Sequence, residues 1–180
     1  MNPWTLIDTA KVPGGGDELR LKRRGSEFSI MLGTNELMNS RLSGSQEALA
    51  RLSSEKIRVR PKAKMLIGGL GLGFTLRAPL AELPQEASVV VAELVPAVIR
   101  WAKGEMAEVF QGCLDDPRVA IVEADVGELI RAKKAAYDAI LLDVDNGPEA
   151  LTREENDRIY DAGGLGAAKA ALKPGGVLSV

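Results

Sequence analysis

Short runs of consecutive apolar residues recur along the chain from about residue 63 to residue 180. A strand with one face in water alternates apolar and polar residues, whereas a strand covered on both faces is apolar throughout. Stretches with apolar residues at helical spacing separate the runs, and a helix between two strands favours parallel pairing. We therefore expect buried parallel strands at Met65–Ile67, Val89–Val91, Val119–Val122, Ala139–Leu142 and Val177–Val180.

The stretches between these strands have the spacing of crossover helices. In the last of them, Gly163, Gly164 and Gly166 weaken helical structure, so we expect a break there. Alternating strands and helices predict an α/β fold with a doubly wound, mostly parallel, Rossmann-like sheet. Because the chain stops at Val180 inside the last strand, we also expect that C-terminal strands are missing. The predicted helices are Phe74–Ala81, Pro96–Val109, Val126–Lys133 and Arg153–Leu172.

The beginning of the chain follows a different pattern. Glu18–Lys22 and Glu27–Leu32 read as two short strands joined by a glycine-containing loop, which predicts a small β-hairpin. Ser45–Leu52 has apolar residues at helical spacing and predicts a helix with its first serine as the N-cap. A proline then marks a boundary. We expect an N-terminal hairpin and helix in residues 1–60 and a nucleotide-binding Rossmann-like domain in residues 61–180, together forming one compact unit.

Composition and charge narrow the class of protein. A chain of 180 residues with 46% hydrophobic and 27% charged residues suits a single globular domain. No apolar run approaches the roughly 20 residues that span a bilayer, the N-terminus lacks a signal-peptide pattern, and Cys113 has no partner for a disulfide. We therefore expect a cytoplasmic protein without membrane contact. With 23 basic and 25 acidic residues, a net charge of −2 gives no reason to expect nucleic-acid binding.

The chain contains no histidine. This excludes Ser-His-Asp and Cys-His catalysis and most zinc sites, and we expect no metal. Any chemistry has to use carboxylates, lysine, tyrosine or backbone dipoles.

A glycine-rich loop follows the first predicted parallel strand and precedes a predicted helix. Glycines here let backbone N–H groups approach a ligand at a helix N-terminus, which favours a nucleotide-binding loop over a tight turn without a ligand. The spacing does not fit G-x-G-x-x-G, because Phe74 and Leu76 occupy the candidate third positions, so a dinucleotide is disfavoured. The candidate cofactor-binding glycines are Gly68, Gly69, Gly71 and Gly73.

Carboxylates stand where three of the predicted strands end, at the edge where such sheets bind ligands. Glu93 could accept hydrogen bonds from ribose hydroxyls, or it is a surface residue. Asp125 could accept from an adenine amine, or it caps a helix. Asp143 is the candidate catalytic residue, and Asp145 and Asn146 behind it are either ligand-binding or part of a turn.

The order of these motifs resembles the spermidine synthase (polyamine aminopropyltransferase) family over roughly residues 61–180. The N-terminal hairpin also fits that family, and Ile67 stands where ordinary methyltransferases usually carry an acidic residue. The matching segments are Met65–Gly69, Thr75–Arg77, Ala92–Leu94, Asp116–Arg118, Asp125, Tyr137–Asp143 and Gly147–Pro148.

The resemblance implies a methyltransferase-like fold and transfer of an aminopropyl group from decarboxylated S-adenosylmethionine to a diamine, in polyamine biosynthesis. It implies that Asp143 is catalytic, that Asp145 and Asn146 contact the amine substrate, and that the protein is a homodimer. The residues implied to bind the S-adenosylmethionine-type cofactor are Gly68, Gly69, Gly71, Gly73, Glu93, Leu94, Asp125, Val126 and Asp143.

Three departures from the family pattern keep alternatives open. Gly71 stands where the family carries an acid that receives the ammonium of decarboxylated S-adenosylmethionine. Asn146 replaces a second aspartate, with Asp145 displaced by one position, and Ser45-Gln46-Glu47 replaces Tyr-His-Glu. A methyltransferase that uses ordinary S-adenosylmethionine, or a relative without catalytic activity, therefore remains an alternative.

Overall fold

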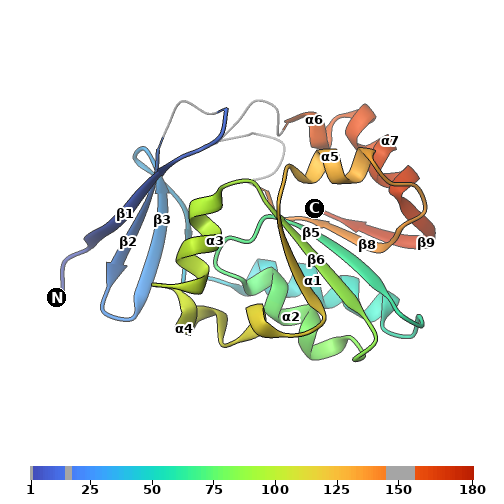
Figure 1. The fold of residues 1–180 in the computed structure, drawn as a ribbon, viewed down its shortest axis with the longest axis horizontal. Coiled ribbons are helices and arrows are strands. Elements are labelled where there is room, and N and C mark those ends of the chain that lie inside the picture. The colour runs from blue at the N-terminus through green and yellow to red at the C-terminus, as the bar shows by residue number, and fades with distance from the viewer. Residues whose placement is uncertain (1, 15–17, 145–156) are drawn as a thin grey trace.

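Two sheets make up the protein (Figure 1). The structure is a computed structural model that describes residues 2–14, 18–144 and 157–180. An antiparallel sheet at the N-terminus packs beside a parallel sheet that carries helices on both faces. The predicted α/β class with a parallel, doubly wound sheet is confirmed.

The N-terminal sheet has the strand order β1-β2-β3-β4, with β1 at Thr5–Lys11, β2 at Glu18–Arg24, β3 at Glu27–Leu32 and β4 at Asn35–Asn39. The predicted N-terminal hairpin is confirmed as β2 and β3, and β1 and β4 extend it to four strands. Strand β1 is mostly exposed and β4 is short and polar, so neither shows the alternation that marks β2 and β3.

Helix α1 spans Gly44–Ile57 and is longer than predicted at both ends. Its N-cap is Ser43, which makes no side-chain capping bond, so the assignment of the cap to the first serine of Ser45–Leu52 was wrong. The helix continues past Leu52 through two buried serines, whose hydroxyls donate to the carbonyls one turn earlier.

The parallel sheet has the order β7-β6-β5-β8-β9. Strand β5 lies in the middle, with β6 and β7 on one side and β8 and β9 on the other, so the chain changes direction across the sheet beside β5. In such sheets ligands bind outside the carboxyl ends of the strands at this point. The strands are Lys64–Gly68 (β5), Ser88–Glu93 (β6), Val119–Glu123 (β7), Tyr137–Leu142 (β8) and Leu172–Ser179 (β9).

Helices cover the two faces of this sheet and enclose two apolar clusters. One cluster lies between the N-terminal sheet, α1 to α4 and one face of the parallel sheet, and the other lies under α5 to α7. Within the described ranges no helix is long and apolar enough to cross a membrane. The remaining helices are α2 (Phe74–Glu82), α3 (Pro96–Lys103), α4 (Ala107–Phe110), the 3₁₀ helix η1 (Cys113–Asp115), α5 (Val126–Arg131), α6 (Asp157–Tyr160) and α7 (Ala162–Ala171).

Two predicted helices are divided. The predicted helix Pro96–Val109 ends early because Gly104 leaves the helical conformation, and α4 follows as a separate turn. The break in the last helix lies at Asp161, which caps α7 through the Gly164 amide, and the glycines expected to break it lie inside α7. A Cβ on Gly164 would meet the Arg158 carbonyl oxygen at 2.2 Å, so glycine there permits α6 and α7 to approach closely.

Asp138 joins three parallel strands at their amino-terminal ends. Its carboxylate accepts hydrogen bonds from the Lys64 amide of β5, from Lys173 of β9 and from Arg60 ahead of β5. Arg60 also donates to the carbonyls of Pro174 and Gly175, which lie inside β9. Burial alone would raise the pKa of Asp138, but these donors outweigh it and hold that pKa below its ordinary value.

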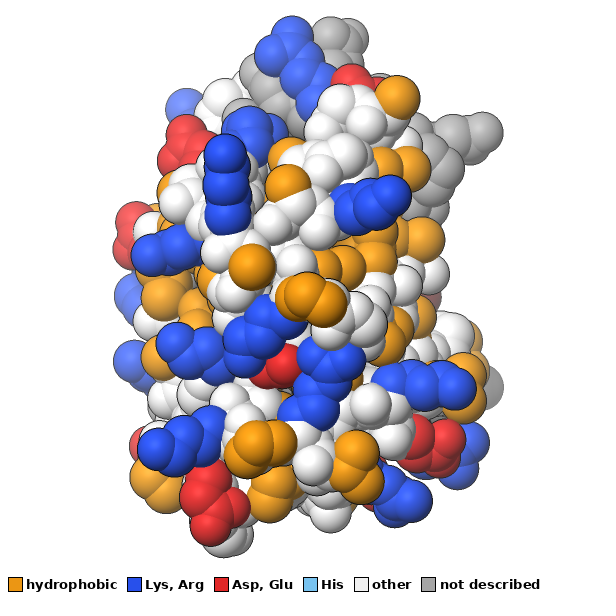
Figure 2. All heavy atoms as spheres, turned by 90° about the vertical axis from the view of Figure 1, so that its right-hand side faces the viewer, with side chains coloured by type: hydrophobic (Ala, Val, Ile, Leu, Met, Phe, Trp, Pro, Cys, Tyr) orange, Lys and Arg blue, Asp and Glu red, His pale blue; other side chains and the backbone are white. Residues whose placement is uncertain are grey.

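Strand β9 is the outer strand on its side of the sheet. Figure 2 shows the side of the molecule on the right in Figure 1, where Lys and Arg side chains are spread among apolar ones.

Candidate active site

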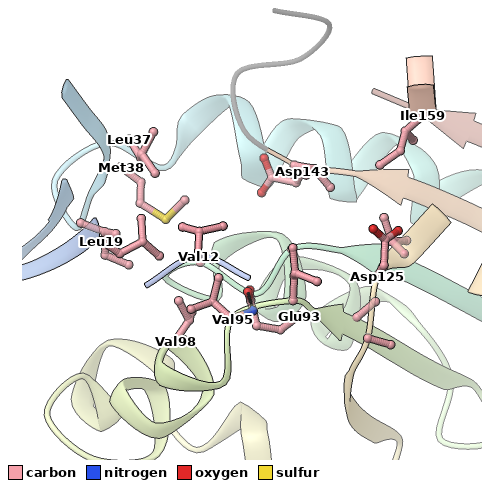
Figure 3. A pocket seen from close by; sticks show the side chains of 18 residues that line it. Val12, Leu19, Leu37, Met38, Glu93, Val95, Val98, Asp125, Asp143 and Ile159 are labelled. Carbon is pink, nitrogen blue, oxygen red and sulfur yellow. Dashed lines mark hydrogen bonds between the residues drawn. The ribbon is translucent and has the colours of Figure 1, made fainter. Parts of the chain in front are cut away.

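A pocket lies where the carboxyl ends of the parallel strands meet the N-terminal sheet (Figure 3). The segments that follow β5, β6, β7 and β8 contribute one wall, and strands β2 to β4 with residue 12 contribute the other. Of the predicted site residues, the pocket brings together Gly69, Gly71, Glu93, Leu94, Asp125, Val126 and Asp143.

The pocket has two chemically different ends. Val12, Leu19 and Met38 lie at one end in Figure 3, and Asp125 lies at the opposite end. Asp143 lies between them. Three carboxylates and no lysine or arginine line the described part of the pocket, so its charge favours cationic ligands.

Asp143 follows β8, and its carboxylate is held on one side. Its Oδ2 accepts a hydrogen bond of 2.5 Å from the Thr75 hydroxyl and one of 3.0 Å from the Gln46 amide. Burial raises the pKa of Asp143 above its ordinary value, and these two bonds offset part of the rise. Among the described residues no bond is made to Oδ1.

Gln46 is a functional candidate that sequence reasoning missed. The residue lies in the first turn of α1, 97 positions before Asp143, and was interpreted only as a departure from the family pattern. Thr75 was known as part of a motif, without a role. Because α1 packs against α2 and β8, the first turns of α1 and α2 bring both side chains to Asp143, and no local sequence pattern reports that contact.

Glu93 ends β6 and is only 7% exposed. Its Oε2 accepts from the Leu70 amide at 2.9 Å and its Oε1 from the Val95 amide at 2.8 Å. Burial raises the pKa of Glu93, and the surrounding backbone amides counter it. The side chain therefore holds the glycine loop against β6 as well as lining the pocket, and it is not a surface residue.

The glycines of the loop differ in whether close packing or the pocket lining accounts for them. A Cβ on Gly69 would meet the Asp143 carbonyl oxygen at 2.4 Å, and a Cβ on Gly73 would meet the Phe110 ring at 2.5 Å. Both residues have positive φ angles. Gly68 and Gly73 are not among the residues lining the pocket. Close packing of the protein against itself therefore accounts for much of the motif.

Gly71 faces the N-terminal sheet. Its φ is 49°, and a Cβ there would lie 2.7 Å from the Met38 sulfur. The Met38 side chain thus fills the space in front of the position where the family carries an acid. Glycine in place of an acid at residue 71 therefore goes together with Met38 of β4, which occupies the space beside it.

Asp125 lines the pocket and also caps α5, since its Oδ1 accepts from the Gly127 amide at 2.7 Å. The two interpretations of this residue are compatible, because a carboxylate has several acceptor positions. Leu94 and Val126 also line the pocket. Asp145 and Asn146, predicted to contact substrate, lie outside the described residues.

Polyamine aminopropyltransferases are similar to this chain in sequence. One from Hyperthermus butylicus is 31% identical over 129 residues, covering 68% of this chain and 41% of that protein. Another, from Pseudomonas aeruginosa, is 30% identical over 126 residues, covering 67% of this chain and 33% of that protein. The chain therefore spans less than half the length of these relatives.

The fold is also that of spermidine synthases. The enzyme from Thermotoga maritima aligns with 93% of this chain and 54% of its own length, with a TM-score of 0.74 and 22% identity. A spermidine synthase in complex with the transition state analogue AdoDATO aligns with a TM-score of 0.72 and 22% identity, over 93% of this chain and 53% of that one. The family model of the spermine/spermidine synthase domain matches residues 43–180. The chain therefore belongs to the spermine/spermidine synthase family.

Proposed function

We propose that this chain carries the donor site and the catalytic carboxylate of an aminopropyltransferase, which transfers the aminopropyl group of decarboxylated S-adenosylmethionine to an amine. The observation that carries the proposal is the position of Asp143, held through one oxygen by Thr75 and Gln46 in a pocket lined by carboxylates. Both proposed substrates are cations, a sulfonium and an ammonium, and such a pocket favours both.

The donor fits the end of the pocket that contains Asp125. Each carboxylate oxygen of Glu93 uses one acceptor position for a backbone amide, and further positions could accept from ribose hydroxyls. We propose that Asp125 accepts from the adenine amine, with Leu94 and Val126 against the ring. Gly69 and Gly71 would lie along the donor.

Asp143 would act as the base. An aliphatic amine has a pKa of roughly 10 and is mostly protonated at neutral pH, so its nitrogen has to lose a proton before it can attack. In the proposed step the proton passes to Asp143 and the nitrogen lone pair attacks the carbon beside the sulfonium. The carbon–sulfur bond then breaks and its electron pair stays on sulfur, which leaves as a neutral thioether. The raised pKa of Asp143 makes it a better proton acceptor than an exposed aspartate.

Methyl transfer from ordinary S-adenosylmethionine is the second candidate. It is favoured by Gly71, because without an acid at residue 71 the pocket loses a partner for the ammonium of the decarboxylated donor and a repulsion against the carboxylate of S-adenosylmethionine. A homodimer and a cytoplasmic location stay predictions, and light scattering of the purified protein would measure the first.

Calorimetric titration with S-adenosylmethionine, its decarboxylated form and methylthioadenosine separates the candidates. We expect tighter binding of the decarboxylated donor, and mass spectrometry should detect an aminopropylated amine. Tighter binding of S-adenosylmethionine and a methylated product would favour the second candidate. Failure of all three ligands to bind would contradict both.

The role of Asp143 has its own test. Asp143→Asn should lower kcat by about 10²–10⁴-fold, the range typical of a lost general base, while binding of methylthioadenosine is retained. Glu123→Gln is the matched control, since Glu123 also ends a parallel strand but is exposed and does not line the pocket. Unchanged turnover in Asp143→Asn would rule out the assignment.

A further inference from the structure

Basic side chains gather at the amino-terminal ends of β5, β8 and β9. Residues 55–64, 131–138 and 169–176 contain the starts of these strands, with ten lysines and arginines and only two acids, whereas the rest of the chain has 13 basic and 23 acidic residues. The net charge of −2 therefore conceals a local excess of positive charge. Figure 2 shows this side of the molecule, where lysine and arginine side chains outnumber acidic ones.

Hydrogen bonds join the three segments into one surface. The Ala136 amide in the second segment donates to the Ala171 carbonyl in the third at 2.7 Å. Arg60 and Lys173, from the first and third segments, both donate to Asp138 in the second. The cations of all three segments therefore share one end of the parallel sheet.

Six of these cations are exposed and have no partner among the described residues. Their side chains form no ion pair and no hydrogen bond in that part of the chain. Glu55 and Glu86 also lie near this end of the sheet, and neither is paired with them. Clustered charges of one sign raise the local potential and attract a surface of the opposite sign. The six residues, here called the basic edge, are Lys56, Arg58, Lys62, Lys64, Lys133 and Lys134.

Exposed apolar side chains lie within and beside the basic edge. Val59 is 83% exposed and stands between Arg58 and Arg60. Leu52, one helical turn before Lys56 on α1, is 59% exposed. A surface that faced only water would gain nothing from these two side chains, so their position among the cations favours a partner that is both anionic and apolar.

We propose that the basic edge is a docking surface for an anionic lipid bilayer, where the cations meet lipid phosphates and Val59 enters the headgroup region. Basic residues beside exposed apolar ones are the combination that holds peripheral proteins on such membranes. Nucleic acid fits less well, because the one aromatic residue of the three segments, Tyr137, is buried and offers no stacking surface to a base. The expectation of no membrane contact rested on the lack of a spanning segment, which a peripheral surface does not need.

Docking in this orientation leaves the candidate active site facing away from the bilayer. The basic edge lies at the amino-terminal ends of the parallel strands, whereas Asp143 and the other carboxylates of the pocket follow their carboxyl ends. Small molecules can therefore reach the pocket from solution while the protein is bound. The proposal does not depend on which reaction the pocket performs.

Co-sedimentation with vesicles tests the proposal. Vesicles of equal parts phosphatidylglycerol and phosphatidylcholine should bind the protein, vesicles of phosphatidylcholine alone should not, and added salt should weaken binding. Lys133→Ala combined with Lys134→Ala should weaken binding about 30-fold, or about fivefold for each lysine. Lys11→Ala combined with Lys103→Ala is the matched control, because it removes the same charge from exposed positions on β1 and α3. Absence of binding to the anionic vesicles, or equal weakening in the two double variants, would overturn the proposal.

A substitution at constant charge tests the apolar contact. Val59→Ser should weaken vesicle binding about fivefold. Leu42→Ser is the matched control and should have no effect, since Leu42 is 75% exposed but lies beyond the opposite end of α1. A single-stranded RNA oligonucleotide is the competing probe. Unchanged affinity in Val59→Ser, or tighter binding of the RNA than of the anionic vesicles, would overturn the proposal in favour of a purely electrostatic surface for polyanions.

Discussion

Asp143 is a carboxylate and is largely buried, a combination that is unfavourable in a residue with a purely structural role. A buried carboxylate is unfavourable because it loses hydration, and the raised pKa of Asp143 expresses that cost. Two hydrogen bonds to Oδ2 offset part of this lost hydration and fix the orientation of the carboxylate. A carboxylate positioned in this way is typical of functional sites, where stability is given up for reactivity.

Thr75 is predicted to be a positioning residue that acts through Asp143. Thr75→Val removes a bond that lowers the pKa of Asp143, so that pKa should rise further and the acid limb of the kcat/KM profile should move to higher pH. Loss of one hydrogen bond to a charged group corresponds to a decrease in kcat/KM of about 10–100-fold. Thr75→Ser keeps the hydroxyl and should restore the profile. A decrease in rate without any shift of the acid limb would indicate a merely structural role.

For single residues, the sequence predicted which side chains line the pocket better than it predicted which other side chains they contact. Residues that end parallel strands converge by topology, and Glu93, Asp125 and Asp143 do line one pocket. The contact of Gln46 with Asp143 depends on where α1 docks, and the match of Met38 with Gly71 depends on a bulge in another sheet. Neither leaves a periodic signal in the chain.

Among the elements, the strongly patterned ones were predictable. All five apolar runs form strands of the parallel sheet. Burial on both faces, the reason for expecting an unbroken run, holds for β5 and β8, whereas the strands at Val119–Val122 and Val177–Val180 were expected to be buried and are only partly so. Strand β4 was missed because its five residues are largely polar, and its role comes from its edge position beside the pocket. The division of the last helix was placed at its glycines, whereas the cap at Asp161 decides it.

The strands β5, β8 and β9 are predicted to depend on Asp138. Asp138→Ala leaves Arg60 and Lys173 without their buried partner and should lower the free energy of unfolding by about 3 kcal/mol at pH 7, the lower end for a broken buried ion pair because both cations are partly exposed. Urea denaturation measures the difference. Glu128→Ala, at an exposed position on α5, is the control and should change little.

The contribution of Asp138 to the free energy of unfolding should decrease as the pH falls. The pKa of Asp138 is lowered in the folded protein, so its stabilising contribution is present above the ordinary aspartate range. That contribution is lost as the pH falls through the folded-state value. The stability curves of the wild-type protein and Asp138→Ala should therefore converge in acid. A constant difference down to the acid-unfolded state would show that the carboxylate charge is not responsible.

At the scale of the whole molecule, the pocket exists only because two sheets are docked. Strand β1 is attached to α3 by the Trp101 indole N–H, which donates to Asp8 at 2.7 Å, and by Arg100, which contacts the same carboxylate at 3.3 Å. Trp101 is 1% exposed. The position of the pocket-lining strands β2 to β4 relative to Asp143 therefore depends on a contact outside the pocket.

Asp8→Ala is predicted to loosen this docking. A buried indole N–H without an acceptor costs about 1–3 kcal/mol, and we expect the lower end because Asp8 is partly exposed. Amine binding should weaken more than binding of methylthioadenosine, since the pocket-lining side chains of β2 to β4 move and those at the Asp125 end do not. Calorimetry measures both affinities, and tryptophan fluorescence reports the altered surroundings of Trp101. Glu18→Ala, on an exposed residue of the same sheet, should have no such effect. Equal weakening of both ligands would contradict the prediction.

The central position of β5 also has a consequence for how the chain is made. Synthesis as far as Glu123 supplies β6 and β7 for one side of β5, but the other side stays open until Tyr137–Leu142 has left the ribosome. During that interval a largely apolar strand presents an unpaired edge, and such edges recruit other chains. The nascent protein therefore passes through a period in which aggregation competes with completion of its own sheet, and protection by chaperones matters most there.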